Sequence, residues 1–79
     1  MAEEVARLRW QCRRGMKELD QLLTRYLDGR YASADADERA AFRALLDLPD
    51  PELAGYFLGR HVPEDPRLAN AVARILGEP

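Results

Sequence analysis

Residues 16–27 read MKELDQLLTRYL and carry the clearest structural pattern of the chain. Their apolar side chains recur three or four positions apart, at Met16, Leu19, Leu22, Leu23, Tyr26 and Leu27. This spacing places the apolar side chains on one face of an α-helix, whereas a half-buried strand would need strict alternation. We therefore predict a helix that buries this face in a core.

A second helical pattern precedes this stretch. Val5, Leu8 and Cys12 form an apolar stripe of the same period, so we predict a helix here too, with Cys12 as a buried, structural thiol. Gly15 separates the two stripes and, having no side chain, can take backbone conformations that other residues avoid. We expect a break or bend at Gly15, or the close approach of another backbone.

The segment 28–37 is polar and separates the second helix from a third. Gly29 is a candidate for the left-handed residue that ends a helix. Asp35 can cap the third helix, and Glu38, three residues later, can reach back in a capping box. Pro49 should stop this helix. Its buried stripe is predicted to contain Phe42, Leu45 and Leu46.

Two tetrapeptides share a helix-starting layout, Asp50-Pro51-Glu52-Leu53 and Asp65-Pro66-Arg67-Leu68. Each places a carboxylate at the N-cap, proline at the first helical position and leucine as the first core residue. The two helices should end near Gly59 and before Gly77. Their predicted core residues are Leu53 and Phe57, then Leu68, Val72 and Ile75, with Leu76 as a further candidate.

These patterns predict an all-α fold, a compact bundle of about five short helices in one domain over residues 1–79. Apolar residues make up 47% and charged residues 33% of the 79 residues, which fits a folded domain and not a disordered tail. No segment approaches the run of about 18 apolar residues of a membrane helix. With a single cysteine, we expect a cytoplasmic protein without membrane insertion.

Few residues could carry catalytic chemistry. The chain has one cysteine and one histidine, His61, and its acids stand mostly at helix starts. These supply no nucleophile with a base, no paired carboxylates in a cleft and no set of metal ligands. We predict that the protein is not an enzyme, that it has no metal site, and that His61 is a loop residue.

Positive charge is concentrated near the N-terminus, although the formal net charge is −2. The cluster consists of Arg7, Arg9, Arg13, Arg14 and Lys17. Together with Trp10 it resembles a basic helix with a stacking aromatic ring, so a nucleic-acid-binding protein is one alternative. The negative charge of the whole chain and the absence of a recognised binding module weigh against that alternative.

The segment 7–20, RLRWQCRRGMKELD, resembles the defining stretch of the SdhE/Sdh5 family, whose signature is Arg-Gly-x-x-Glu. Arg14, Gly15 and Glu18 match this signature. The likeness continues through the joint at residues 48–51 and the helix start at residues 65–66, and departs in a shorter, alanine-rich stretch at 32–36. Members of this family are FAD assembly factors, which support flavinylation of succinate dehydrogenase.

The resemblance implies a five-helix chaperone that binds the immature flavoprotein subunit of succinate dehydrogenase and, in some bacteria, that of fumarate reductase. FAD would become bonded to a histidine of the partner. The chain itself would bind no cofactor stably, since it lacks a glycine-rich phosphate loop, and would be a monomer when free. Some relatives have also carried an antitoxin label, which leaves an antitoxin-type protein as a second alternative.

The resemblance also implies that the signature faces the partner. Gly15 would let two backbones come close, Arg14 would offer its fork of donors to carboxylates or carbonyls of the partner, and Glu18 would offer an acceptor. If a helix continued through Gly15, Arg14 and Glu18 could instead pair with each other. Lys17 and Asp20 border the signature and would extend the contact surface.

Trp10 and Arg7 complete the predicted partner-binding set. Trp10 lies off the apolar stripe and, by helical spacing, on the same side as Arg7, Arg13 and Arg14. An aromatic ring beside arginines has the composition of an interface hot spot. The ring could equally cover the edge of a small core, and the sequence leaves both readings of Trp10 open.

Overall fold

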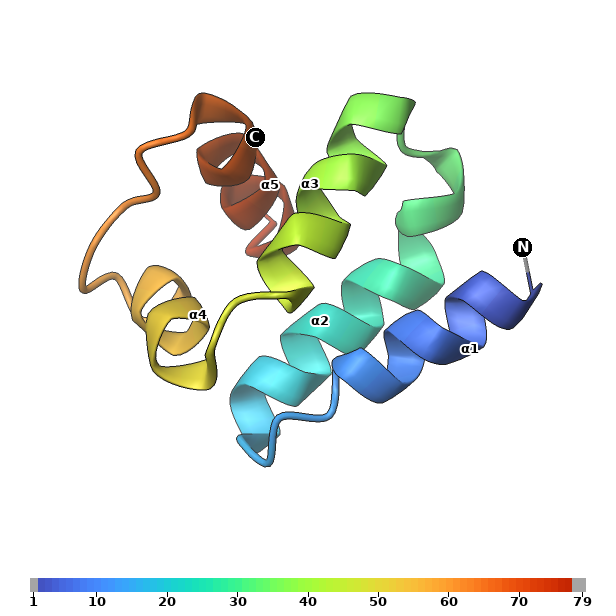
Figure 1. Cartoon of the computed structure of the whole chain (residues 1–79), viewed down its shortest axis with the longest axis horizontal. Helices are drawn as coiled ribbons and strands as arrows, with labels where there is room; N and C mark the ends of the chain where they lie inside the picture. The colour runs from blue at the N-terminus through green and yellow to red at the C-terminus, as the bar shows by residue number, and fades with distance from the viewer. Residues whose placement is uncertain (1, 78–79) are drawn as a thin grey trace.

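The computed structural model describes residues 2–77, which form five α-helices and one short 3-10 helix (Figure 1). In chain order these are α1 (Ala2–Gln11), α2 (Lys17–Gly29), η1 (Tyr31–Ser33), α3 (Ala36–Leu46), α4 (Asp50–Phe57) and α5 (Pro66–Ile75). The predicted all-α bundle is confirmed. Within residues 2–77, no helix has the length and apolar composition needed to cross a membrane.

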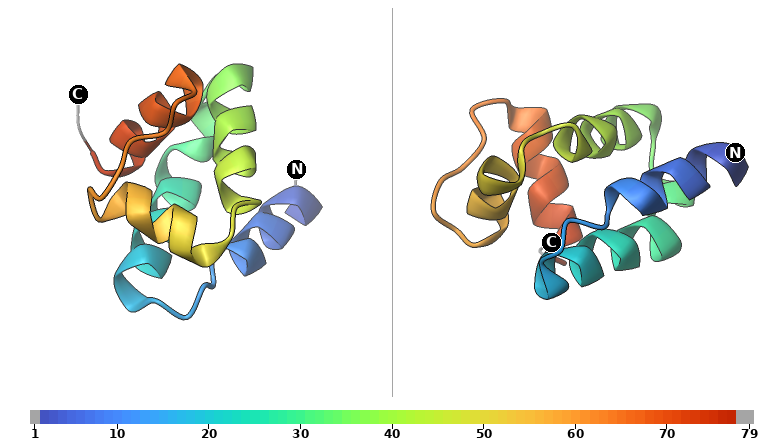
Figure 2. Two further views of the ribbon diagram at one scale, coloured as in Figure 1. Left: turned by 60° about the vertical axis from the view of Figure 1, so that its left-hand side comes forward. Right: turned by 60° about the horizontal axis from the view of Figure 1, so that its bottom comes forward.

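The core lies where α2 and α3 meet the other helices. α1 packs beside α2, and α3 packs against α5 (Figures 1 and 2). The largest fully buried side chains are Tyr31, Phe42, Leu23, Leu45, Leu53 and Cys12. The rings of Tyr26 and Tyr31 lie 4.8 and 5.6 Å from the ring of Phe42, so the centre of the core is aromatic. Burying each of these side chains stabilises the fold by roughly 2 kcal/mol.

The predicted break at Gly15 is confirmed. α1 ends at Gln11 and α2 begins at Lys17, and Gly15 between them has a φ of +79°. A residue with a side chain would lose about 1 kcal/mol in this left-handed conformation. An ideal Cβ on Gly15 would meet no atom within 4 Å, so the glycine is needed for the turn and not for close packing inside this chain.

The prediction that Gly29 ends α2 in a left-handed conformation is wrong. Within residues 2–77 only Gly15, Gly59 and Gly77 have positive φ, and the latter two follow α4 and α5 as expected. α2 ends because the chain tightens into η1, where the Tyr31 ring is buried in the core. The helix therefore ends where the buried Tyr31 ring redirects the chain, and not at a left-handed glycine.

The capping box predicted at α3 is half correct. The Asp35 carboxylate accepts a hydrogen bond from the Glu38 N–H at 2.8 Å, so Asp35 is the N-cap. The Glu38 carboxylate does not reach back to the cap. It accepts hydrogen bonds from the Tyr26 hydroxyl at 2.5 Å and the Arg30 Nε at 3.0 Å, and pairs with Arg74 at 3.3 Å. Glu38 therefore links α2, α3 and α5.

The two Asp-Pro helix starts differ. Asp65 caps α5 as predicted, accepting a hydrogen bond from the Arg67 N–H at 2.9 Å. Asp50 is not the N-cap of α4; Pro49 takes that place, and the Asp50 carboxylate binds Arg14. The prediction of a buried Leu68 is also wrong, because this side chain at the first turn of α5 is only half-buried. Leu53, Phe57, Val72 and Ile75 are buried as predicted, whereas Leu76, the further candidate, is partly buried.

Candidate functional site

The residues of the predicted site gather where α1 turns into α2. The connecting loop lies at an edge of the molecule, with α1 on one side of the start of α2 and α4 on the other (Figures 1 and 2). Gly15, Lys17 and Glu18 are exposed, whereas Arg14 and Asp20 are partly buried. The loop therefore has an outer face open to solvent and an inner face held by the protein.

Asp20 holds the inner face of the loop. Its Oδ1 accepts a hydrogen bond from the Arg14 N–H at 2.8 Å, and its Oδ2 accepts one from the Gly15 N–H at 3.2 Å. Met16, the N-cap of α2, makes no side-chain capping bond. A carboxylate close to this helix start also suits the helix dipole. Asp20 thus fixes both loop amides from within α2.

The Arg14 side chain turns inward, with only 12% of its surface exposed. Its Nε donates to the Gln11 carbonyl at 2.8 Å, and its Nη1 donates to the Leu48 carbonyl and to Asp50 Oδ1, both at 3.0 Å. Its Nη2 donates to the Leu46 carbonyl. The fork of donors that we expected to face a partner therefore binds carbonyls and a carboxylate of its own chain. Arg14 also does not share the face of Trp10, since α1 has already ended.

Glu18 lies on the outer face, in the first turn of α2. Its carboxylate makes no hydrogen bond or ion pair with any part of residues 2–77. The pairing of Arg14 with Glu18 that a continuous helix would allow is absent there, because the helix is broken at Gly15. Lys17 is exposed next to Glu18. The exposed part of the site is thus Gly15, Lys17 and Glu18.

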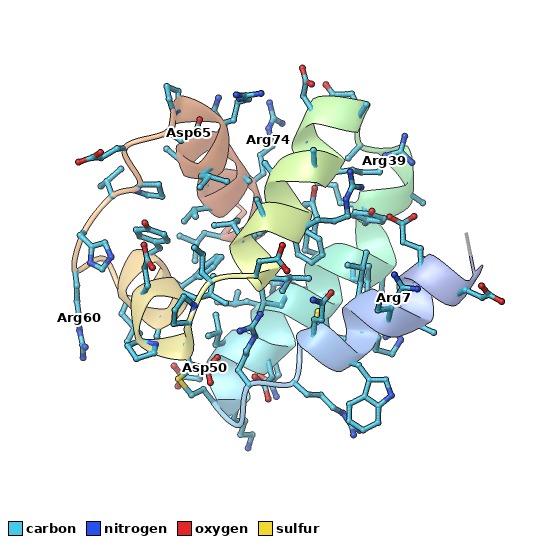
Figure 3. All side chains as sticks on the ribbon, viewed as in Figure 1. Arg7, Arg39, Asp50, Arg60, Asp65 and Arg74 are labelled. Atoms are coloured by element: carbon cyan, nitrogen blue, oxygen red, sulfur yellow. The ribbon has the colours of Figure 1, made fainter. Side chains whose placement is uncertain are left out.

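Trp10 is exposed, with 71% of its surface accessible, so its ring does not cover the edge of the core, and its role at an interface stays a prediction. It lies in the last turn of α1, and the Arg13 guanidinium lies 5.2 Å from the centre of its ring. Arg7, one turn earlier, is also exposed (Figure 3). An exposed aromatic ring with a guanidinium next to one of its faces is suited to contact with another macromolecule.

An apolar groove next to Glu18 was not predicted from the sequence. It lies between the start of α2 and α4 and has a volume of about 360 Å³. Its apolar lining comes from Met16, Leu19, Leu22, Ala54, Phe57 and Leu58. Leu58 is 60% exposed. No local pattern set Leu58 apart from its neighbour Phe57, because adjacent residues of a helix can both face the core, as Tyr26 and Leu27 do here.

The basic cluster is not a continuous cationic surface. Arg9 pairs with Asp28 at 2.5 Å, and Arg14 is directed inward. Of the remaining cations, exposed Glu18 lies beside Lys17 and lines one hollow with Arg13, whereas Arg7 is exposed on α1. Polyanion binding depends on the number of phosphates neutralised, so this arrangement weakens the nucleic-acid alternative.

Cys12 and His61, the other side chains that could carry chemistry, are not part of a catalytic or metal-binding group within residues 2–77. Cys12 is completely buried, as predicted, and burial raises the pKa of its thiol to about 11. His61 is exposed in the loop after α4, with its ring 4.6 Å from the ring of Tyr56. In the part of the chain that the structure describes, no group of three or more His, Cys, Asp or Glu residues could hold a metal ion.

Comparison with known proteins places the chain in a family. Residues 6–78 match the family model described as "Flavinator of succinate dehydrogenase". The chain is 51% identical over 69 residues to the FAD assembly factor SdhE of Methylococcus capsulatus, covering 87% of this chain and 83% of that protein.

Two further relatives agree with this match. The FAD assembly factor SdhE of Pseudomonas aeruginosa is 44% identical over 73 residues, covering 92% of this chain and 87% of that protein. SdhE of Shewanella oneidensis is 42% identical over 73 residues, covering 92% and 89%. No solved structure gives a significant match. The chain therefore belongs to the SdhE/Sdh5 family of succinate dehydrogenase flavinators, as its sequence indicated.

Proposed function

We propose that this chain is a FAD assembly factor, which binds the immature flavoprotein subunit of succinate dehydrogenase and promotes the covalent attachment of FAD to it. Its family and the names of its relatives support this proposal. The flavoprotein subunit of fumarate reductase is a second candidate partner. The chain is then a chaperone and not an enzyme, acts in the cytoplasm as a monomer, and leaves the FAD with the partner.

The observation that carries the proposed contact is the open Gly15 turn. An added Cβ at Gly15 would project into free space and not into this protein, and the neighbouring Glu18 carboxylate has no partner within residues 2–77. A partner backbone can therefore approach Gly15 closely and present a donor to Glu18. Lys17 lies beside them and extends the same surface.

Two apolar features flank this polar centre and can contribute binding energy. The groove lined by Leu58 lies on the α4 side, and the exposed ring of Trp10, in the last turn of α1, lies on the α1 side. Interfaces obtain most of their affinity from a few such aromatic or apolar anchors around which polar contacts are arranged. Arg7 is exposed on α1, one turn before Trp10, and is a further candidate for this surface.

The proposal is tested by covalent flavin on the partner subunit, measured as in-gel fluorescence. Cells that lack this protein would be supplied with wild type, Gly15→Arg, Gly15→Ala or Gly29→Arg. We expect rescue by wild type and loss of rescue by Gly15→Arg, because the long side chain would occupy the space that the partner needs.

Two variants separate this steric effect from other causes. Gly15→Ala introduces the same backbone strain, about 1 kcal/mol, with almost no bulk, so it should rescue largely. Gly29→Arg adds the same charge and bulk at the opposite end of α2, where the space is also open, and should rescue fully. Flavinylation that does not depend on the wild-type protein would refute the proposed function and bring the nucleic-acid alternative forward.

A further inference from the structure

The Arg14 side chain donates four hydrogen bonds within its own protein. A guanidinium has five N–H donors, and Arg14 uses all three of its nitrogens on four acceptors. Two of these acceptors, the carbonyls of Gln11 and Leu46, belong to the last residues of α1 and α3. The carboxyl ends of helices favour a cation, so Arg14 joins two helix ends to the start of α4.

A partner could use Arg14 only by breaking these bonds. The side chain is 12% exposed, and withdrawing it would leave helix-end carbonyls without their donor. Glu18, four residues later, is exposed and free of internal bonds within residues 2–77. Two charged residues of one signature are thus in opposite situations.

Asp20 completes the restraint on the loop. Its two oxygens hold the successive amides of Arg14 and Gly15, so Arg14 is fixed at its backbone by α2 and at its side chain by α1, α3 and α4. Gly15, the next residue, has no side chain to hold it and is the most permissive kind of residue in the backbone. Without these neighbours the turn would sample many shapes.

From this arrangement we infer that Arg14 and Asp20 are positioning residues, which hold the Gly15 turn in its binding shape, while Gly15 and Glu18 make the contact. This inference rests on the proposed function. A turn that is ordered before binding does not lose that conformational freedom in the complex, so the restraint increases affinity without adding a contact.

The test measures two quantities for each variant: its affinity for the flavoprotein subunit that lacks covalent FAD, and the conformation of the loop in the free chain. The variants are Arg14→Lys, Asp20→Ala and Asp20→Asn, and the loop is followed through the amide NMR signals of Arg14 and Gly15. Arg14→Lys keeps the charge but cannot bind four acceptors at once, so we expect the signals to move and the affinity to fall about tenfold.

Asp20→Ala should have the same effect, and Asp20→Asn, which keeps one acceptor oxygen, should weaken binding only about threefold. Two controls separate position from stability. Arg60→Lys changes an exposed arginine outside the loop (Figure 3), and Glu38→Gln lowers stability far from the loop. Both should leave the affinity and the two amide signals at their wild-type values.

Each other outcome overturns the inference. A loss of affinity with unmoved amide signals would mean that Arg14 or Asp20 touches the partner directly. Moved signals with wild-type affinity, or no change in either quantity, would mean that the shape of the turn does not limit binding. If the wild-type chain itself fails to bind the subunit, the proposed function is refuted, and this inference with it.

Discussion

Arg14 and Glu38 are two ionic centres with nearly the same burial, at 12% and 11% side-chain exposure. Arg14 connects the ends of α1 and α3 with α4, and Glu38 connects α2, α3 and α5. Their surroundings differ. The cations next to Glu38, Arg30 and Arg74, both pair with it, whereas the residue that follows Arg14 is an open glycine.

This difference distinguishes residues that hold the fold together from residues that are available to contact a partner. A largely buried charge with several internal partners holds helices together, because leaving one of those partners unpaired costs free energy. An exposed charge without an internal partner, such as Glu18, is available to another molecule. Variants at the two centres should therefore change different quantities: stability at Glu38, and affinity at the surface beside Arg14.

The largest effect is expected for Glu38→Ala. The variant leaves the Tyr26 hydroxyl and the cations of Arg30 and Arg74 without their acceptor, so the free energy of unfolding should fall by about 2 kcal/mol. Urea unfolding measures this. The folded fraction should bind the flavoprotein subunit with wild-type affinity, and a tenfold loss there would erase the distinction between the two centres. Glu64→Ala, an exposed acid of the α4–α5 loop, is the control.

Trp10→Ala should produce a change of similar size in affinity and not in stability. The ring is 71% exposed, so its removal should alter the free energy of unfolding by less than about 0.5 kcal/mol. As an aromatic anchor it should contribute about 2 kcal/mol to binding, roughly a 30-fold change in affinity. The control is Val62→Ala, which removes a side chain that is 77% exposed elsewhere. Equal affinities for the two variants would exclude Trp10 from the interface.

A smaller effect is expected for Glu18→Gln, which keeps the shape of the side chain and removes its charge. If the carboxylate accepts a charge-assisted hydrogen bond from the partner, affinity should fall about tenfold. The urea midpoint should stay at the wild-type value, since no bond inside residues 2–77 is lost. If the variant binds with wild-type affinity but unfolds at a lower urea concentration, Glu18 stabilises the fold and does not contact the partner. Glu64→Gln serves as the matched control.

The helices and the turn at Gly15 could be read from the sequence because both depend on local patterns. Apolar residues three and four apart defined α1 to α5, and a glycine between two stripes located the turn. The roles of acids and arginines could not be read in this way. Asp50 and Glu38 stand at helix starts, where a carboxylate can cap the helix, yet the carboxylate of each pairs with an arginine far away in the sequence.

Arg14 shows the same limit at the site itself. Its side-chain acceptors at Leu46, Leu48 and Asp50 lie 32, 34 and 36 residues further along the chain. An arginine in an exposed motif and one that joins the ends of two helices to the start of a third look identical in a local pattern. Only the packing of α3 and α4 against the loop decides between them.

The smallest expected effect is a dependence of stability on pH that belongs to Glu38. Burial pushes the pKa of this carboxyl upward, but the hydrogen bonds from Tyr26 and Arg30 and the charges of Arg30 and Arg74 outweigh it. The net pKa lies below its ordinary value of 4.5, so the folded state releases the proton more readily than the unfolded chain. This contribution is complete above about pH 4.5 and is lost as the pH falls through the folded-state pKa.

Wild type should therefore lose more stability than Glu38→Gln between pH 7 and acid pH, as measured by urea unfolding at a series of pH values. The variant cannot be protonated at this position, so its curve should be flatter below about pH 4.5. Parallel curves would show that other carboxylates determine the acid response. Because Glu38 titrates well below neutral pH, its protonation should not change the affinity at the open Gly15 turn near neutral pH. Stability at Glu38 and affinity at Gly15 should therefore differ in their pH dependence as well as in their response to mutation.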